Sequence, residues 1–286
     1  MGQQLTGCTV IVLAGGQGKR MGRLGRFSAK AALSAYDQPL LLRLINQIHV
    51  AGFQRVMVST DPVHFSQLKA LISSYMERDA GTNSHSFDIQ VFENSAHSNG
   101  ALEALAEVLR HIKTSRCLMC LGDIFFRDNP FLRLVAEVNG IHTCLGVAQP
   151  VDPYELMQGG IVRCHDQEIV AVIERPQPAY GDELRWSGIA LFGRELGSDL
   201  EAFLEETPND SPLGDLFEFY RKRGHLLRAI LVPDFVNVNS PDHLLLASLY
   251  VAIESHHGAT TLQKALVKAA KQLRSTLARA EQVETV

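Results

Sequence analysis

The segment "VIVLAGGQGKRMGRLGRFSAK", Val10–Lys30, runs from an apolar strand into a glycine-rich turn and then into a cluster of cations. Glycines placed directly after a strand let the backbone approach a phosphate chain and point N–H groups at it. Arg20 and Lys30 add positive charge close to that turn. The segment therefore predicts a phosphate-binding loop at the end of a strand, and the alternative is a tight turn without a ligand.

Two familiar phosphate motifs do not fit this loop. A P-loop needs Ser or Thr after Gly-Lys, where this chain has Arg20, and it needs a glycine where this chain has Leu13. The dinucleotide fingerprint needs a third glycine at the position of Met21, whose side chain would block close contact between helix and strand. The loop therefore belongs to another class of phosphate site.

The bulk composition narrows the class of protein. The chain has 286 residues, of which 46% are hydrophobic and 20% are charged, as in ordinary soluble domains. Its formal net charge of −4 argues against a dedicated nucleic-acid binder. Its apolar runs are shorter than the ~18 residues of a membrane span. We therefore expect neither nucleic acid nor a membrane as a partner.

The cysteines predict a reducing compartment. Two of the five, Cys117 and Cys120, have C-x-x-C spacing, but they lie inside an apolar run and no second pair has metal-site spacing. The N-terminus lacks the pattern of a secretory signal. We expect buried thiols and a cytoplasmic protein.

The first half of the chain alternates between strand and helix patterns. Such alternation predicts a parallel sheet covered by helices on both faces, with ligands bound beyond the carboxyl ends of the strands. The glycine loop and Asp123 both follow expected strands, so we expect them to face one pocket. The expected strands are 10–13, 55–60, 87–93 and 117–126, the last ending in Gly122-Asp123, and the expected helices are 39–52, 61–76 and 100–112.

Beyond Asn129 short strands separated by turns predict a mixed or antiparallel extension of the sheet. A later helix should begin with Ser240 as N-cap and Pro241 at its first position. The tail, residues 260–286, reads as an amphipathic helix that packs on the body or forms a homo-oligomer contact. We expect a catalytic domain over residues 1–250 and a helical tail over 251–286. The apolar stripe of the tail comprises Leu262, Leu266, Ala269, Leu273 and Leu277.

Several segments resemble, in order, the signature of the sugar-phosphate nucleotidylyltransferases. Leu13–Met21 is similar to LAGG-x-G-[TS]-R-[LM], and Lys30 follows Met21 after eight residues, as the signature requires. The resemblance covers about Val10 to Ala247. The other matching segments are Tyr36–Leu40, Leu121–Asp123, Val170–Pro176, Ser187–Ile189 and Asn237–Pro241.

The number of residues between Met21 and Lys30 separates the chain from related families. Molybdopterin guanylyltransferases and terpenoid-pathway cytidylyltransferases resemble it but have a shorter gap before the lysine. The longer gap and the Glu174-Arg175-Pro176 segment favour a sugar-1-phosphate substrate. Asn94 and the segment Ser98–Leu102 loosely resemble a motif of phosphocholine cytidylyltransferases, which leaves a phospho-alcohol acceptor as an alternative.

The resemblance implies a fold and an activity. The expected fold is Rossmann-like, a three-layer α/β/α nucleotidyltransferase fold of GT-A type with a mixed central sheet. The expected enzyme is a Mg²⁺-dependent nucleotidyltransferase that joins an NTP to a sugar-1-phosphate, giving an NDP-sugar and pyrophosphate. A different class of function is a catalytically weak homologue that binds nucleotide or sugar phosphate for regulation. The base and the acceptor stay open.

The resemblance also assigns roles to residues. Arg20, Lys30 and Asp123 are the expected catalytic residues, and Asp123 and Asn237 are the expected metal ligands. The expected nucleotide-binding residues are Leu13, Ala14, Gly15, Gly16, Gly18, Asn94, Asn99 and Gly100. The expected acceptor-binding residues are Gly160, Glu174, Arg175, Ser187 and Gly188.

Three features depart from the family pattern. Asn237 stands where the family usually has a second aspartate, so we expect weaker metal binding. Arg175 replaces a lysine but remains a cation. Arg23 and Arg26 lie in a glycine-rich segment, where they would clamp phosphates as a lid does or point into solvent.

Overall fold

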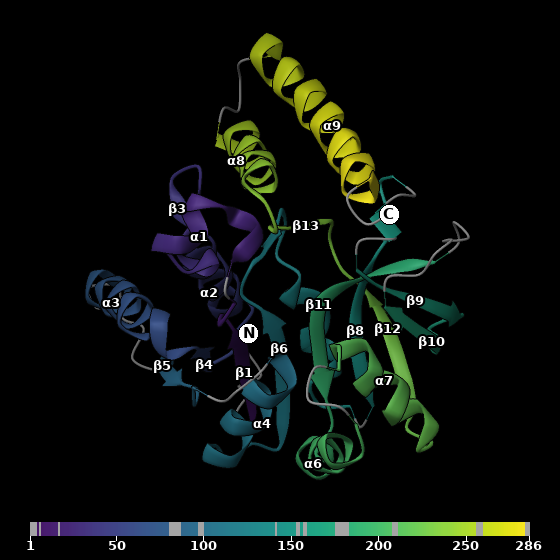
Figure 1. Ribbon diagram of the computed structural model, residues 1–286. Coiled ribbons are helices and arrows are strands. Elements are labelled where there is room, and N and C mark those ends of the chain that lie inside the picture. Colours follow the sequence, from purple (N-terminus) through teal and green to yellow (C-terminus); the bar gives the residue numbers. More distant parts are fainter. Residues whose placement is uncertain are drawn as a thin grey trace.

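A nine-stranded mixed sheet with helices on both faces forms the centre of the computed structural model (Figure 1). This is the three-layer α/β/α arrangement that the sequence predicts. The structure describes Leu5 and residues 7–16, 18–79, 87–96, 100–140, 142–152, 155–156, 159–174, 183–207, 211–255 and 260–283.

As predicted, parallel strands make up one side of the sheet; the four strands lie in the order β5-β4-β1-β6. Leu13 at the end of β1 lies opposite Ser59 on β4 and Leu121 on β6. This register brings the three chain segments that follow these strands to the same edge of the sheet. The bounds are β1 Cys8–Leu13, β4 Arg55–Thr60, β5 Asp88–Glu93 and β6 Arg116–Leu121.

The other side of the sheet is mixed, which confirms the predicted change of pattern beyond Asn129. β11 pairs antiparallel with β6, and the order continues as β11-β8-β12-β10-β9. β9 also pairs with β11, so these five strands curve back on themselves. The bounds are β8 Thr143–Ala148, β9 Gly160–His165, β10 Glu168–Glu174, β11 Leu184–Phe192 and β12 Leu227–Leu231.

The segment predicted as one strand to Phe126 is divided in the structure. β6 ends at Leu121, the chain turns at Gly122-Asp123, and β7 (Ile124–Phe126) pairs instead with β13 (Phe235–Asn237) in a separate two-stranded sheet. The N–H of Gly122 donates to the carbonyl of Leu13 at 2.9 Å, which fixes the turn. Apolar character alone does not show where such a run bends.

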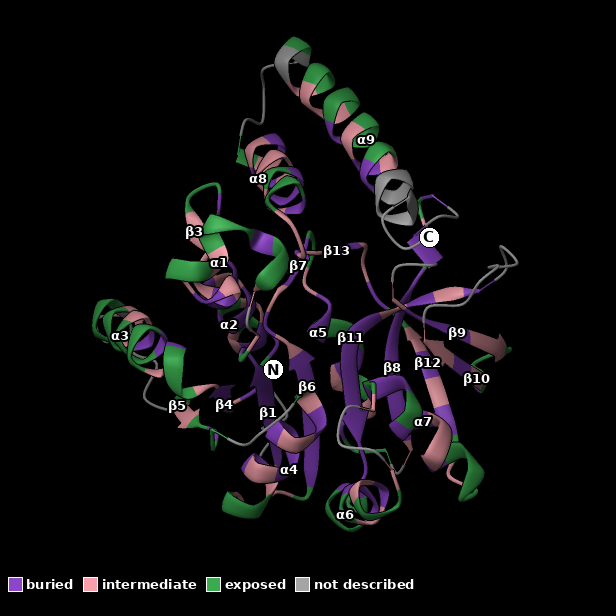
Figure 2. Cartoon of the chain, viewed as in Figure 1, coloured by how far each residue is buried: buried purple, intermediate pink, exposed green. Residues whose placement is uncertain are grey.

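Two groups of helices cover the sheet through their apolar sides, which are buried in Figure 2. One face packs against α2, α3 and α5, and the other against α4, α6 and α7. Within the described ranges no helix is long and apolar enough to cross a membrane. The bounds are α2 Leu40–Val50, α3 Pro62–Asp79, α4 Ala101–His111, α5 Phe131–Leu134, α6 Leu196–Glu206 and α7 Leu213–Lys222.

Two C-terminal helices, α8 (Pro241–Ser255) and α9 (Thr260–Val283), lie side by side at one end of the molecule (Figure 1). The hydroxyl of Ser240 accepts the N–H of His243 at 3.3 Å, which confirms the predicted N-cap. The expected boundary after residue 250 falls inside α8, because that helix runs on to Ser255.

The apolar stripe of α9 differs at one position from the prediction. Leu266, Leu273 and Leu277 pack in a cluster with α8, as expected, but Ala269 is exposed and Ala270 is the buried alanine. The side chain of Leu262 lies outside the described residues. α9 therefore contacts the body of the chain through its leucines.

The cysteines carry free thiols, as predicted. Cys8, Cys117, Cys120 and Cys144 are buried, and Cys164 is half-buried. Burial raises the pKa of the Cys144 thiol to about 11, so this thiol stays protonated at neutral pH and is a poor nucleophile.

Candidate active site

The carboxyl ends of β1, β4 and β6 surround a cavity of about 150 Å³. The glycine loop and Asp123 both line it, so the structure brings together the two features that the sequence places at strand ends. The lining residues are Leu13, Ala14, Gly15, Gly16, Lys30, Ala31, Ser59, Ala101, Ala104, Leu121 and Asp123.

Close backbone packing explains two of the glycines at this cavity. A Cβ on Gly15 would lie 2.9 Å from the backbone nitrogen of Asp61, and a Cβ on Gly122 would lie 3.2 Å from Cα of Ala14. The loops after the three strands therefore touch through their backbones. Gly15 and Gly16 bring backbone to the wall of the cavity, where peptide N–H donors suit a phosphate chain.

A short helix, α1 (Arg23–Phe27), packs against the later part of the glycine loop. Gly18 has a left-handed φ of +57°, and a Cβ on Gly25 would lie 2.2 Å from the carbonyl oxygen of Gly18. α1 thus packs directly on the loop through Gly25, while Arg23 and Arg26 are exposed. Gly18 and Gly25 are required by this contact, and the two arginines are free to meet a ligand from solvent.

A charged centre joins three elements at the mouth of the cavity. The ammonium group of Lys30, on the short 3₁₀ turn Lys30–Ala32, forms an ion pair with the carboxylate of Asp123 and donates to the side-chain oxygen of Asn239 at 3.3 Å. Both side chains of the ion pair are largely shielded from solvent. Arg20 is exposed on the neighbouring turn Lys19–Met21. The site therefore holds one carboxylate and two cations beside the glycine loop.

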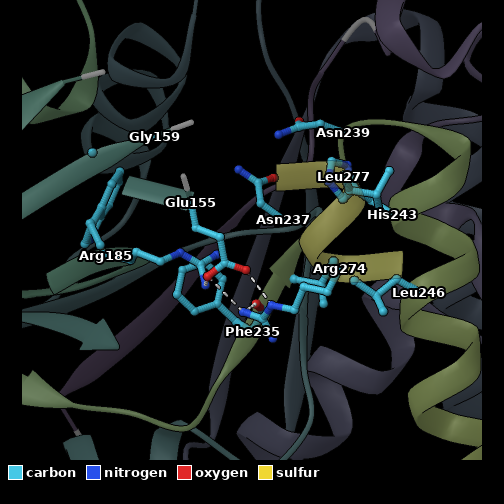
Figure 3. Close-up of a pocket in the computed structure, with 13 residues that line it drawn as sticks. Glu155, Gly159, Arg185, Phe235, Asn237, Asn239, His243, Leu246, Arg274 and Leu277 are labelled. Carbon is cyan, nitrogen blue, oxygen red and sulfur yellow. Dashed lines mark hydrogen bonds and ion pairs between the residues drawn. The ribbon is translucent and has the colours of Figure 1, made fainter. Parts of the chain in front are cut away.

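The predicted metal ligands lie on neighbouring segments. Asn237 lies opposite Ile124 in the β7–β13 pair, and the N–H of Val238 donates to the carbonyl of Asp123 at 2.9 Å. Figure 3 shows the Asn237 amide directed into a pocket. One carboxylate and one amide oxygen fit Mg²⁺, which takes few protein ligands and completes its shell with phosphates and water. In the described part of the chain no three His, Cys, Asp or Glu side chains gather at a metal-sized site, so substrate oxygens would have to complete the shell.

A second pocket, of about 50 Å³, is lined by residues that include Asn237 and Asn239 (Figure 3). Asn239 lines it and also accepts the hydrogen bond from Lys30, which lines the first cavity. The two pockets therefore meet at Lys30 and Asn239. The residues around the second pocket are Glu155, Gly159, Gly160, Arg185, Trp186, Phe235, Val236, Asn237, Asn239, His243, Leu246, Arg274 and Leu277.

The predicted nucleotide residues divide into two groups. Leu13 to Gly16 line the first cavity, whereas Asn94 is buried behind it and exchanges hydrogen bonds of 2.9 and 3.0 Å with the hydroxyl of Ser59. Gly100 precedes α4 with a φ of +116°, and the cavity is lined by Ala101 after it. Asn99 lies outside the described residues.

Of the predicted acceptor residues, two lie near the second pocket. Gly160 lines it, and Glu174 accepts the N–H of Gly214 at 3.0 Å, so its carboxylate caps the start of α7. A Cβ on Gly160 would lie 3.3 Å from the Glu174 carboxylate. Arg175 lies outside the described residues.

Ser187 and Gly188, also predicted to bind the acceptor, line neither pocket. The hydroxyl of Ser187 is buried and donates to the carbonyl of Gly146 at 2.8 Å on the neighbouring strand. Gly188 has a φ of +73°, and a Cβ on it would lie 2.3 Å from a methyl group of Ile124. Ser187 therefore ties β11 to the neighbouring strand, and Gly188 lets β11 pack closely on Ile124 of β7.

Sequence reasoning missed several residues of the second pocket. Trp186, the single tryptophan, lines it and anchors its indole N–H on the carbonyl of Ile189 at 3.0 Å. Its place next to the Ser187-Gly188 motif is the one signal that could have found it. Arg185 lies beside Trp186, two residues before the same motif, whereas Glu155 and Arg274 lie far from the quoted motifs, and the sequence contains no pattern that joins the three.

His243 is buried and lines the second pocket. Burial, joined by the positive charges of Arg20 and Arg185, lowers its pKa to about 4, against the opposing effect of Asp242. Its ring nitrogen Nδ1 lies 3.1 Å from the hydroxyl of Ser240. At neutral pH the imidazole is uncharged, so it acts in this pocket as a hydrogen-bonding group.

The lowered pKa of His243 predicts a loss of stability in acid. The unfolded chain takes up this proton near pH 6.5 and the folded chain only near pH 4, so the free energy of unfolding falls as the pH drops through that window. Between pH 7.5 and 4.5 we expect this residue to contribute roughly 2–3 kcal/mol of the loss. Urea unfolding of His243→Gln at both pH values should show a correspondingly smaller difference.

His165, whose side chain is 87% exposed, is the matched control for His243. His165→Gln should keep the pH dependence of the natural protein. If His243→Gln loses as much stability in acid as the natural protein, His243 does not cause the effect.

A family model described as a MobA-like NTP transferase domain matches residues 10–208. The chain belongs to this family. The matched range includes the glycine loop, Lys30, Asp123 and β11, and so covers most of the first cavity. Asn237, Asn239 and both C-terminal helices lie beyond it.

The chain is also similar to enzymes that are named as sugar-phosphate nucleotidylyltransferases. It is 23% identical over 237 residues to glucose-1-phosphate thymidylyltransferase of Neisseria meningitidis, an alignment covering 82% of this chain and 78% of the relative. UDP-glucose pyrophosphorylase of Acinetobacter baumannii superposes with a TM-score of 0.73 and 14% identity, covering 91% of this chain and 99% of that one.

A further pyrophosphorylase structure, complexed with UDP-glucose, superposes with a TM-score of 0.71 and 15% identity and covers 86% of this chain and 98% of that one. These similarities show the GT-A-like nucleotidyltransferase fold, as the sequence predicts.

Proposed function

We propose that this transferase moves a nucleotidyl group from an NTP to a sugar-1-phosphate and releases pyrophosphate. The observation that carries the proposal is the meeting of two pockets at Lys30 and Asn239, beside Asp123. One pocket has the backbone donors and cations that suit a triphosphate, and the other has polar groups that suit a hydroxylated acceptor. The relatives named for glucose-1-phosphate and UDP-glucose support the same class of substrates.

In the proposed reaction an oxygen of the acceptor phosphate attacks the α-phosphorus of the NTP. The bond from that phosphorus to the bridging oxygen breaks, and pyrophosphate leaves with the electron pair. The protein contributes position and charge rather than a covalent intermediate. We assign the triphosphate to the N–H groups of the loop around Gly15 and Gly16, the leaving-group charge to Arg20, and the α-phosphate to Lys30.

Asp123 and Asn237 would hold Mg²⁺ together with phosphate oxygens. A bound Mg²⁺ would supply positive charge at the reacting phosphates. The ammonium of Lys30, which is paired with Asp123 in this structure, then has a second anion to contact in the phosphate chain. Asn237 contributes no charge of its own, so we expect the affinity for metal to depend strongly on bound nucleotide.

Two rival functions follow from particular residues. The loose resemblance of Asn94 and Ser98–Leu102 to a phosphocholine cytidylyltransferase motif leaves a phospho-alcohol as an alternative acceptor. The neutral Asn237 points to a regulatory homologue that binds ligands without turnover. Arg20, Lys30 and Asp123 are all present, which favours catalysis. The buried, protonated thiols fit a cytoplasmic enzyme.

A panel assay tests the proposal. The protein is incubated with Mg²⁺, each of CTP, UTP, GTP and dTTP, and each of glucose 1-phosphate, mannose 1-phosphate, N-acetylglucosamine 1-phosphate and phosphocholine, and pyrophosphate is measured. We expect release with at least one sugar-1-phosphate. Release with phosphocholine alone would establish the phospho-alcohol reading, and binding without release from any pair would establish the regulatory one.

The contact between α1 and the glycine loop gives a prediction for this reaction. Gly25→Ala places a methyl group 2.2 Å from the carbonyl oxygen of Gly18, so the loop must move. Because a shift of about 1 Å in substrate position can cost about a hundredfold, we expect kcat/KM for the NTP to fall by roughly 10- to 100-fold. Steady-state kinetics with varied NTP measure the change.

Gly197→Ala, in α6, is the matched control, because among the described residues a Cβ there has no neighbour within 4 Å. This variant should keep the natural rate. A Gly25→Ala enzyme with unaltered kcat/KM would show that the loop tolerates displacement and does not hold the triphosphate.

A further inference from the structure

One wall of the second pocket comes from the C-terminal helix α9, outside the range that matches the family model. Arg274 and Leu277 project from α9 into this wall. Arg274 is only 4% exposed, which is unusual for a cation at the end of a chain. Its burial calls for partners that offset the lost hydration.

Those partners are two carboxylates from separate segments. The Arg274 guanidinium donates to both carboxylate oxygens of Glu155 and to both carboxylate oxygens of Asp234. It also reaches the carbonyl of Phe235 and the hydroxyl of Tyr250, each at 3.4 Å. Every nitrogen of the group is engaged, so Arg274 has no donor to spare for a ligand.

Glu155 is shared with a second arginine. Arg185, on β11, donates from Nη1 to Glu155 at 2.8 Å, and its guanidinium lies 4.1 Å from the centre of the Phe235 ring (Figure 3). Within the described ranges its Nε and Nη2 donate to no protein acceptor. Arg185 is therefore fixed in position by Glu155 and Phe235 and keeps donors for the pocket that it lines.

α9 also holds the segment that leads into the pocket. The hydroxyl of Ser275 donates to the carboxylate of Asp152 at 2.9 Å, one residue along α9 from Arg274. The N–H of Glu155 in turn donates to the carbonyl of Asp152 at 2.9 Å. Two contacts thus hold the segment between β8 and β9 on α9: Ser275 with Asp152, and Arg274 with Glu155. This segment leads to Gly159 and Gly160, which line the pocket.

The charges of the cluster are balanced. Two arginines face two carboxylates, Glu155 and Asp234, so the cluster does not by itself attract a phosphate. Lys30, at the junction of the pockets, and Arg20, exposed on the neighbouring turn Lys19–Met21, remain for that group. The free donors of Arg185 suit uncharged hydroxyl oxygens, to which a charged donor gives stronger hydrogen bonds than a neutral one.

We infer that α9 completes the acceptor site: Arg185 contacts hydroxyl groups of the acceptor, and Arg274 is a positioning residue that holds Glu155, and through it Arg185, in place. The inference rests on the proposed function. It names the hydroxyl-bearing part of the sugar-1-phosphate as what the second pocket recognises, and it makes the C-terminal helix part of substrate selection.

The test is steady-state kinetics of Arg274→Lys with the NTP and acceptor that the natural enzyme uses best in the panel above. A lysine keeps the charge but cannot reach both carboxylates with a planar fork. Since misplacing a binding group by about 1 Å is costly, we expect KM for the acceptor to rise about tenfold or more. KM for the NTP should stay within about twofold, because no described residue of α9 lines the first cavity.

Lys271→Met is the matched control, because Lys271 is exposed on the same helix. It should leave both KM values unchanged. Equal rises in both KM values for Arg274→Lys, or an unchanged acceptor KM, would overturn the inference. The proposed function would still stand in that case, because it depends only on the activity of the natural enzyme. No release by the natural enzyme with any pair would overturn both.

If Arg274→Lys does not fold, the variant Ser275→Ala tests the role of α9 in the acceptor site. It removes only the hydrogen bond to Asp152 and leaves the buried charges paired. We expect the acceptor KM to rise about threefold with the NTP KM unchanged, since the segment that carries Glu155 loses one of its contacts with α9 while the Arg274 contact remains. A Ser275→Ala enzyme with both KM values unchanged would overturn the role of α9.

Discussion

Changing Asp123 to Asn is expected to lower the rate of pyrophosphate release by about a thousandfold, the scale on which loss of one transition-state charge contact acts in other enzymes. The side chain keeps its shape but loses the charge that pairs with Lys30 and that would hold Mg²⁺. Rates are measured at saturating NTP and acceptor, with Mg²⁺ varied.

The fold should survive this change. Asp123 lies at a turn whose backbone is fixed by hydrogen bonds from Gly122 to Leu13 and from Val238 to Asp123, and none of these uses the carboxylate. The matched control is Asp128→Asn, on an exposed residue of the same segment, which should keep the natural rate. A near-normal rate in a folded Asp123→Asn enzyme would remove Asp123 from the proposed site.

Changing Lys30 to Met is expected to lower kcat by about 100- to 1000-fold. Its ammonium is the group that joins Asp123 to Asn239 at the meeting point of the two pockets. Methionine fills a similar volume, so the loss reports charge and hydrogen bonding rather than packing. Single-turnover measurements of pyrophosphate release separate this step from product release.

Lys30→Arg should not restore the rate. A Cβ on Gly18 would lie 3.4 Å from Cγ of Lys30, and one on Gly16 would lie 3.5 Å from its Cε, so the lysine stem runs close along the glycine loop. The larger planar head of arginine needs more room than this passage gives. Lys19→Met, on an exposed lysine of the neighbouring turn, is the control and should be near normal. Full activity of Lys30→Arg would show that charge alone suffices there.

The sequence predicted the parallel half of the sheet and the first cavity well, because both depend on local patterns. Short apolar runs between amphipathic segments fix β1, β4 and β6, and parallel strands bring their carboxyl ends to one edge. The loop after Leu13 and the residue Asp123 had to meet there once those strands paired. Ser59 and Ala101, which also line the cavity, carry no comparable signal.

The residues of the second pocket were predicted less completely. Gly160 lines this pocket, but Ser187, which was also expected to bind the acceptor, turns its hydroxyl to Gly146 on the neighbouring strand. The direction of a side chain at an irregular strand position depends on a register shift that β11 makes between Trp186 and Ala190. A motif locates such residues along the chain but does not decide which face they take.

The sequence by itself determined the glycine loop, the strands that place it, and the cations and carboxylate that accompany it, because strand pairing turns local order into proximity at one edge. Only the tertiary structure decided that Arg274 closes the second pocket. Its hydrogen bonds to Glu155 span 119 residues and follow no periodic pattern. They exist because α9 packs on α8 through its leucines, and that packing buries a guanidinium where two carboxylates can offset its lost hydration.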